Sequence, residues 1–272
     1  MPITADFHLH SNHSFDSQAP METIIEKAIS KGLTHICFTE HMDMVYPVTP
    51  DTPEGCFILN TDSYLYDLIR CRQKYASRIT IGLGVELGLQ TSIARELAIY
   101  AKSYDFDFII GSSHVADGLD PYYPSYFEGQ TEEEAYRKYF RSEIDNIRRI
   151  SNYDVYGHLD YVVRYGPGVD REYSYEKYKD LFDEMLTLLI EKEKGIEINT
   201  GGLRKGLREA NPCSDVIKRY RELGGEIITV GSDAHGPADV GADFDRAAEI
   251  LTQCGFKYYT VFHSRMPEFK KI

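Results

Sequence analysis

Short runs rich in β-branched and aromatic residues alternate regularly with amphipathic segments along this chain, and few folds accommodate such a pattern. The runs predict about eight strands, near residues 4–9, 34–39, 79–87, 107–113, 154–158, 196–200, 226–231 and 258–262. Strands that are joined through helices run parallel, because a parallel pair needs a long crossover connection. The alternation therefore predicts an α/β fold built on a parallel sheet.

The segments between these runs have the end signals of helices. Thr131 followed by Glu134 has the spacing of a capping box. The segment from about 175 to 194 carries apolar residues on one face and ends at Gly195. At 272 residues, the pattern predicts a single domain over 1–272 that forms a closed or nearly closed (β/α) barrel. An open doubly wound sheet is the alternative.

The composition limits the partners and the compartment. The chain has 30 Lys+Arg against 43 Asp+Glu, a net charge of −13, which argues against nucleic acid or an anionic membrane as the main partner. It has no long apolar window and no secretion signal at its start, and its five scattered cysteines form no CxxC pair. These features predict a cytoplasmic protein, and they do not distinguish a monomer from a small homo-oligomer.

Seven of the nine histidines fall at or just after the carboxyl end of a predicted strand. In a β/α barrel these ends form the active-site face, so the polar residues there are expected to converge on one cavity. They are His8, His10, Glu40, His41, Glu86, His114, His158, Asp160, Asp233, His235 and His263. So many titratable groups at one mouth are costly to bury unless a cation is bound among them, which favours a metal centre.

Spacing and position suggest how individual residues act. His8 and His10 lie two apart on one strand, so both imidazoles face the same point, and Asp233 and His235 repeat the spacing. Glu86 follows a glycine-rich strand and suits bridging two ions, with a helix cap or a lysine pair as the alternative. For Asp16, in the loop after the first strand, a metal ligand and ordinary turn chemistry are both possible. His35 lies within an apolar run and is expected in the core.

Six motifs then carry a resemblance to a known family. HLHSNHSFD, FTEHMD, GVEL, GSSH, GHLD and GSDAH occur in this order over nearly the whole chain, and the set resembles the PHP (polymerase and histidinol phosphatase) superfamily. FTEH, GSSHVADGLDPY, YGHLDYVVRYG and EINTGGLRK are most similar to its histidinol-phosphate phosphatase branch. The resemblance implies a distorted, usually seven-stranded barrel, so the eighth run is expected to lie beside it or to join it imperfectly.

The resemblance also implies a cluster of three divalent metal ions. The first would be held by His8, His10, Glu86 and Asp233, the second by Glu86, His114 and His158, and the third by Asp16, His41 and His235. Mixed nitrogen and oxygen ligands fit zinc, manganese or iron, and they disfavour calcium or magnesium as the only metals.

The implied activity is hydrolysis of L-histidinol phosphate to L-histidinol and phosphate, in histidine biosynthesis, by a hydroxide that bridges two metals. An acidic protein needs dedicated cations for the phosphate oxygens, and Arg164 and Arg204 are the candidates, with Lys205 a weaker third. Asp233, His235 or a metal-bound water is expected to transfer the proton to the leaving alcohol.

The loop 115–129, VADGLDPYYPSYFEG, offers carboxylates and aromatic rings for the ammonium and imidazole of such a substrate. Its acidic residues are Asp117, Asp120 and Glu128. An ordinary lid packed by its own aromatic residues is the alternative. Asp160 is expected either to contact the substrate or to orient His158.

Other functions stay open on the sequence alone. A PHP phosphoesterase acting on a nucleotide or a sugar phosphate is the nearest alternative. A nuclease would need a basic channel, which the charge does not suggest. An amidohydrolase-like C–N hydrolase also begins with HxH, but such enzymes usually bridge their metals with a lysine, and this chain has Glu86 there. A non-catalytic metal-binding module would be expected to have lost ligands.

Overall fold

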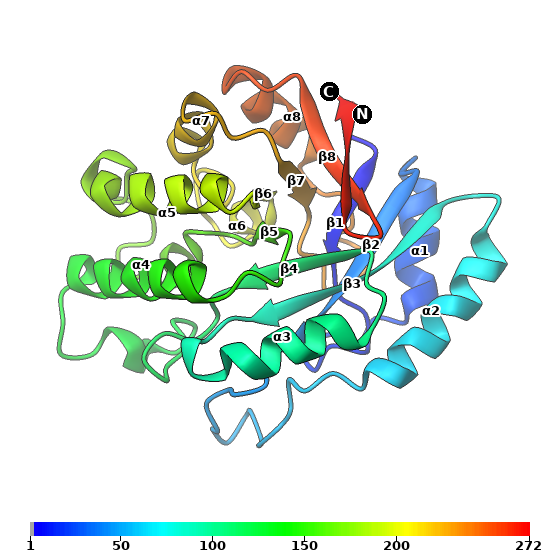
Figure 1. The fold of residues 1–272 in the computed structure, drawn as a ribbon, viewed down its shortest axis with the longest axis horizontal. Helices are drawn as coiled ribbons and strands as arrows, with labels where there is room; N and C mark the ends of the chain where they lie inside the picture. The colour runs from blue at the N-terminus through cyan, green and yellow to red at the C-terminus, as the bar shows by residue number, and fades with distance from the viewer. Residues whose placement is uncertain (1–2) are drawn as a thin grey trace.

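Seven parallel strands follow one another in chain order around a barrel (Figure 1). The computed structural model describes residues 3–272. The strands are β1 (Ala5–Leu9), β2 (His35–Met42), β3 (Thr80–Gly88), β4 (Phe108–Ser112), β5 (Val155–Tyr156), β6 (Gly195–Asn199) and β7 (Ile228–Gly231). Leu9 pairs in parallel with Ala234, just after β7, so the sheet is nearly closed. The predicted distorted (β/α) barrel is confirmed, and the open doubly wound alternative is wrong.

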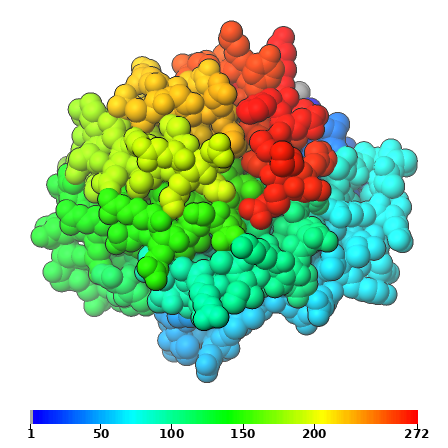
Figure 2. All heavy atoms as spheres, viewed as in Figure 1, coloured from blue at the N-terminus to red at the C-terminus, as the bar shows by residue number. Residues whose placement is uncertain are grey.

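Helices connect the strands and cover the outside of the barrel (Figures 1 and 2). They are α1 (Met21–Ser30), α2 (Thr61–Tyr75), α3 (Ala94–Ser103), α4 (Glu132–Arg149), α5 (Lys179–Glu191), α6 (Gly201–Arg204), α7 (Ser214–Glu222) and α8 (Phe244–Gln253). The predicted capping box is present at the start of α4, where the Glu134 carboxylate accepts from the Thr131 amide at 2.8 Å. None of the helices within residues 3–272 has both the length and the apolar character needed to cross a bilayer.

The eighth predicted strand does not join the barrel. It forms β8 (Tyr258–His263), which pairs antiparallel with β9 (Met266–Lys271) in a separate two-stranded sheet. The two residues between them, Ser264 and Arg265, have positive φ angles of 47° and 66°, as a tight hairpin turn requires. Figure 1 shows this hairpin in red.

The hairpin places His263 away from the carboxyl ends of the strands, so the expectation that it joins the cavity is wrong. Its ring stacks on His35, the first residue of β2, with 4.6 Å between ring centroids. Behind this pair, Phe262 packs on Phe108, and Phe108 packs on Phe7, at centroid distances of 5.0 and 5.3 Å. The hairpin therefore covers the amino-terminal end of the barrel with aromatic side chains.

The predicted core position of His35 is confirmed, because the residue is only 6% exposed and meets Phe7 edge to face. Burial, followed by the nearby His263, lowers the pKa of His35 to about 4. A neutral imidazole therefore fits this site, and a protonated one does not.

This histidine should make stability depend on pH. Between pH 6.5 and 4 the unfolded chain binds a proton at residue 35 that the folded chain does not, so the free energy of unfolding falls as pH drops through this window. At pH 5 the loss from this one residue is about 2 kcal/mol. Between pH 7 and pH 5, we expect the free energy of unfolding of His35→Phe to fall about 2 kcal/mol less than that of the parent. Urea unfolding of both proteins at the two pH values measures this difference. Equal losses in the two proteins would contradict the lowered pKa.

Candidate metal centre and active site

The carboxyl ends of the barrel strands surround one cavity of about 670 Å³. The predicted site residues on its wall are Asp16, His41, His114, Asp120, His158, Arg164, Arg204, Lys205, Asp233 and His235. Beneath the wall lie three more, His8, His10 and Glu86, each fully buried. The barrel thus brings together residues separated by more than two hundred positions, because each follows or ends a strand of the same parallel sheet.

Glu86, near the end of β3, is the centre of this cluster. Its Oε2 lies 3.3 Å from His8 Nε2, 3.5 Å from His10 Nε2 and 3.0 Å from His41 Nδ1. Burial alone would raise the pKa of Glu86, but the surrounding histidines, His8 first, lower it well below its usual value. Glu86 is therefore a carboxylate whose charge faces several imidazoles.

The other carboxylate oxygen of Glu86 faces two further histidines. Its Oε1 lies 3.2 Å from His114 Nε2 and 3.0 Å from His158 Nε2, and it accepts a hydrogen bond from Ser112 at 2.7 Å. One carboxylate thus touches two separate groups of imidazoles, one through each oxygen. This is the arrangement expected of a ligand shared between two metal ions.

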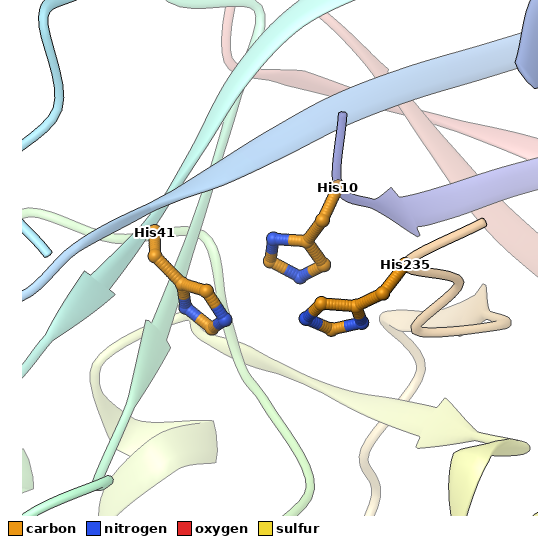
Figure 3. A group of neighbouring side chains, drawn as sticks. All are labelled: His10, His41 and His235. Atoms are coloured by element: carbon orange, nitrogen blue, oxygen red, sulfur yellow. The ribbon is translucent and has the colours of Figure 1, made fainter. Parts of the chain in front are cut away.

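A third group of imidazoles lies towards the cavity. Figure 3 shows His10, His41 and His235 grouped together, and the ring centroids of His41 and His235 each lie 4.2 Å from that of His10 and 5.6 Å from one another. Asp16 Oδ2 lies 3.5 Å from His41 Nε2 and 3.3 Å from His235 Nε2. Asp233 Oδ1 lies 3.7 Å from His10 Nε2. The structure therefore places the Asp16 carboxylate beside these imidazoles, in the turn after β1, and its role as a ligand stays a prediction.

Unpaired buried atoms show that the cluster fits metal ions. Within the part of the chain that the structure describes, His8 Nε2, His10 Nε2, His41 Nδ1 and Glu86 Oε2 are buried without a hydrogen-bond partner. Such atoms are costly unless they are ligated. Burial, and then the neighbouring imidazoles, lower the pKa of His10 well below its usual value, so its ring is neutral, the form that binds metal.

Four groups of three side chains lie close enough to hold an ion. They are His8–His10–Asp233, His8–Glu86–His158, His41–Glu86–His114 and His10–His41–His235. One of these groups, His8–His10–Asp233, lies within the predicted set for the first ion. The other three combine residues that the prediction gives to different ions, and none of the four includes Asp16. The assignment of each ligand to an ion stays a prediction.

Sequence reasoning missed the residues that orient these ligands. Glu197 of β6 accepts from His8 Nδ1 at 2.7 Å, and Asp43 accepts from His114 Nδ1 at 2.9 Å. A carboxylate on Nδ1 directs Nε2 of the same ring towards the cluster. The available signals were a charged residue in the middle of the apolar run IEINT and the last residue of FTEHMD.

Arg164 ends a 3₁₀ helix, Tyr161–Arg164, and lies on the cavity wall with a side chain only 4% exposed. Its Nη1 donates to Asp233 Oδ2 at 2.9 Å, and its Nε and Nη2 donate to Asn211 and Asn199, both at 2.8 Å. The guanidinium is thus in the predicted place, held by two asparagines that sequence reasoning missed.

Arg204 and Lys205 follow β6 and line the same cavity. Arg204 donates to the carbonyl of Ser232 and lies 3.4 Å from Asp239 Oδ1. Its side chain is 23% exposed, so it is less constrained than Arg164. All three cations thus line the cavity, and Arg164 and Arg204 are each paired with an aspartate there.

Two predicted substrate contacts are corrected. Asp160 is 1% exposed and absent from the cavity wall, because its oxygens accept from Asn211, Tyr173 and the amide of Cys213. It also does not orient His158, whose Nδ1 has no hydrogen-bond partner among residues 3–272.

Asp117 is the second predicted substrate contact that the structure corrects. Its carboxylate pairs with Lys138 at 3.0 Å on the exposed side of the loop. Glu128, from the same loop, is exposed and also absent from the cavity wall.

Glu40, near the end of β2, does not join the cluster. It accepts from Ser11 and Ser14 at 2.6 Å each, so it anchors the loop after β1.

Asp120 is the acidic residue of the 115–129 loop that reaches the cavity. It accepts from Tyr46 Oη at 2.5 Å, from the Tyr122 amide at 2.7 Å and from Tyr161 Oη at 3.3 Å. Aromatic residues form the wall around it, and they are Phe15, Tyr46, Phe57, Tyr122, Tyr123, Tyr161 and Tyr165. Two of these residues, Tyr46 and Phe57, come from 43–60, a segment to which the sequence pattern gave no role.

A barrel with imidazoles and carboxylates clustered at the carboxyl ends of its strands, beside arginines, has the architecture of a metal-dependent hydrolase. Comparison with known families narrows this class. Residues 6–201 match the PHP domain, and the chain belongs to that family.

Named relatives cover almost the whole chain. A histidinol-phosphatase of Lactococcus lactis is 33% identical over 258 residues, which are 94% of this chain and 93% of the relative. A probable histidinol-phosphatase of Clostridium acetobutylicum is 34% identical over 93% of this chain and 94% of its own. The solved structure of the histidinol phosphate phosphatase from L. lactis, in complex with zinc, L-histidinol and phosphate, superposes with a TM-score of 0.89 at 30% identity. It covers 97% of this chain and 98% of that one.

Proposed function

We propose that this chain is a metal-dependent phosphomonoesterase that hydrolyses L-histidinol phosphate to L-histidinol and phosphate. The observation that carries the proposal is the cavity itself, where a cluster of unpaired imidazoles and carboxylates lies beside a buried arginine. A relative of the same fold and length is described as binding zinc, L-histidinol and phosphate. The chain's five cysteines are all free, which supports the proposed cytoplasmic location.

The metal ligands in this proposal are His8, His10, Asp16, His41, Glu86, His114, His158, Asp233 and His235. They would hold three divalent ions, zinc among them, with manganese or iron as alternatives. Such ions lower the pKa of a coordinated water and neutralise phosphate oxygens. Glu197 and Asp43 keep the rings of His8 and His114 in the orientation that ligation requires.

Arg164, Arg204 and Lys205 bind the phosphate group in this proposal. A guanidinium has five N–H groups, and three of those of Arg164 donate to protein atoms, which leaves two for phosphate oxygens. Because the planar group is already fixed, little entropy is lost when phosphate binds. Asp233 and His235 are the residues proposed to transfer a proton to the leaving alkoxide, and His235, 31% exposed, is the more accessible of the two.

Asp120 and the surrounding aromatic residues recognise the rest of the substrate in this proposal, because a cationic amine and an imidazole are attracted to a carboxylate and to ring faces. We expect Asp120→Asn to raise KM for L-histidinol phosphate about tenfold. Hydrolysis of p-nitrophenyl phosphate, which carries no amine, should change less than about twofold. A steady-state comparison of both substrates tests this, and equal losses on both would argue against a recognition role.

The decisive experiment for the proposed function is phosphate release from L-histidinol phosphate beside a panel of nucleotide and sugar phosphates, with metal content counted in the same sample. A strong preference for L-histidinol phosphate, with two to three metal ions per chain, is the expected result. Metal without that preference would point to another small phosphate ester. Absence of bound metal after reconstitution would overturn the ligand assignment.

A further inference from the structure

A chain of hydrogen bonds runs from a buried aspartate outside the cavity to the centre of the site. Asn211 Nδ2 donates to Asp160 Oδ1 at 2.5 Å, and Arg164 Nε donates to Asn211 Oδ1 at 2.8 Å. Arg164 Nη1 then donates to Asp233 Oδ2 at 2.9 Å. Asp160 and Arg164 lie in the segment after β5, Asn211 in the segment after β6 and Asp233 after β7, so three segments are connected in this way.

The direction of these hydrogen bonds is fixed at both ends. Arg164 Nε–H can only donate, so the atom of Asn211 that faces it must be the amide oxygen. The NH₂ group of Asn211 then faces Asp160, whose other oxygen accepts from the Cys213 amide at 3.0 Å and from Tyr173 Oη at 2.8 Å. If the Asn211 amide were rotated by half a turn, its NH₂ group would face the Arg164 Nε–H donor and its oxygen would face the Asp160 Oδ1 acceptor.

Burial makes this arrangement costly to disturb. Asp160 is 1% exposed and Asn211 is 0% exposed, so water does not replace a lost partner there. The packing is also tight, because a Cβ atom at Gly202 would collide with the amide oxygen of Asn211. Gly202, the second glycine of the run INTGGL, therefore leaves room for this asparagine beside the cavity.

We propose that Asp160 is a positioning residue that acts through Asn211 to hold the guanidinium of Arg164 in the plane that binds phosphate. This inference rests on the proposed function, since it assigns Arg164 to the phosphate group. Asp160 is absent from the cavity wall, so it contacts no substrate. It sets the orientation of Asn211, and Asn211 in turn holds the Nε edge of Arg164 so that its remaining N–H groups face the cavity.

A double-mutant cycle between positions 160 and 164 tests the proposal. Asp160→Asn replaces an acceptor with an amide that cannot accept from all three donors. It should lower kcat/KM for L-histidinol phosphate about 10- to 100-fold while zinc content stays at the parent level. In an Arg164→Ala background, the same change should cost less than about twofold. An equal loss in both backgrounds, an unchanged kcat/KM, or loss of zinc with activity would each overturn the proposal.

Asp154→Asn is the matched control, because Asp154 is also a buried aspartate but lies beside Arg265 at the other end of the barrel. It should lower the melting temperature and leave kcat/KM unchanged. If Asp160→Asn does not fold, Asn211→Ala takes its place in the cycle, with the same expected result. If the parent does not hydrolyse L-histidinol phosphate, that failure belongs to the proposed function. The cycle is then measured as the affinity for inorganic phosphate by calorimetry. If Asp160→Asn weakens phosphate binding in the parent but not in the Arg164→Ala background, the positioning role is supported.

Discussion

Glu86→Gln should lower the metal content and the phosphatase activity together. Each oxygen of this carboxylate faces a different group of imidazoles, so an amide would replace one of the two oxygens by an NH₂ group that cannot ligate. The charge of Glu86 would also be lost from a cluster in which it neutralises bound cations. We expect kcat/KM to fall at least about 1,000-fold, equivalent to about 4 kcal/mol, with metal content reduced by one or more ions per chain.

Glu143→Gln provides the matched control, because Glu143 is an equally buried glutamate in α4 that is absent from the cavity wall. It should retain the metal and the activity of the parent. Metal content by elemental analysis and steady-state kinetics on both variants separate a ligand effect from a general effect of changing a buried glutamate. A Glu86→Gln protein with full metal content would show that Glu86 does not bridge the ions.

The fold could be predicted from the sequence because the signal is periodic. Short apolar runs separated by helices define a parallel sheet, and the barrel follows from the number of strands. The eighth run lies beside the barrel, as one of the two expected arrangements had it, and the reason is local. Its composition is that of a strand, but the turn at Ser264 and Arg265 reverses the chain, and neither residue is a usual choice for positive φ. A strand pattern does not indicate which neighbour the strand pairs with.

The cluster could be predicted for a related reason, because the end of a parallel strand fixes both the place and the direction of the residue found there. As this principle predicts, the side chains of His8, His114 and Asp233 converge on the cluster. Residues on loops do not obey it. Asp160 and Asp117 carry the expected charge, yet one is buried against Asn211 and the other faces Lys138. Only the path of the loop decides which carboxylate reaches the cavity.

The orienting residues were missed because they resemble ordinary buried polar groups in a sequence. Glu197 contacts the proposed ligand His8, whereas Asn199 and Asn211 accept from Arg164, and none of the three lines the cavity. Their role depends on a partner far away in the chain, as the 2.7 Å contact between Glu197 and His8 illustrates. Spacing within one segment carries no information about such a partner.

Arg164→Ala should separate phosphate binding from metal binding. The guanidinium touches Asp233 through one nitrogen, but Asp233 also lies against His8, His10 and His235, so the cluster keeps its other contacts. The variant should retain the metal content of the parent. Its kcat/KM should fall about 100- to 1,000-fold, because a desolvated cation that meets charge on the phosphate oxygens is worth about 3 to 4 kcal/mol in such a site.

Arg208→Ala is the control for this change, since Arg208 is 66% exposed, pairs with Asp170 and is absent from the cavity wall. The kcat and KM of Arg208→Ala should equal those of the parent. Unchanged kcat and KM in Arg164→Ala would refute the phosphate role of this residue. Loss of zinc together with activity would instead assign Arg164 to holding Asp233 in the cluster, because its removal leaves Asp233 Oδ2 without its charged partner.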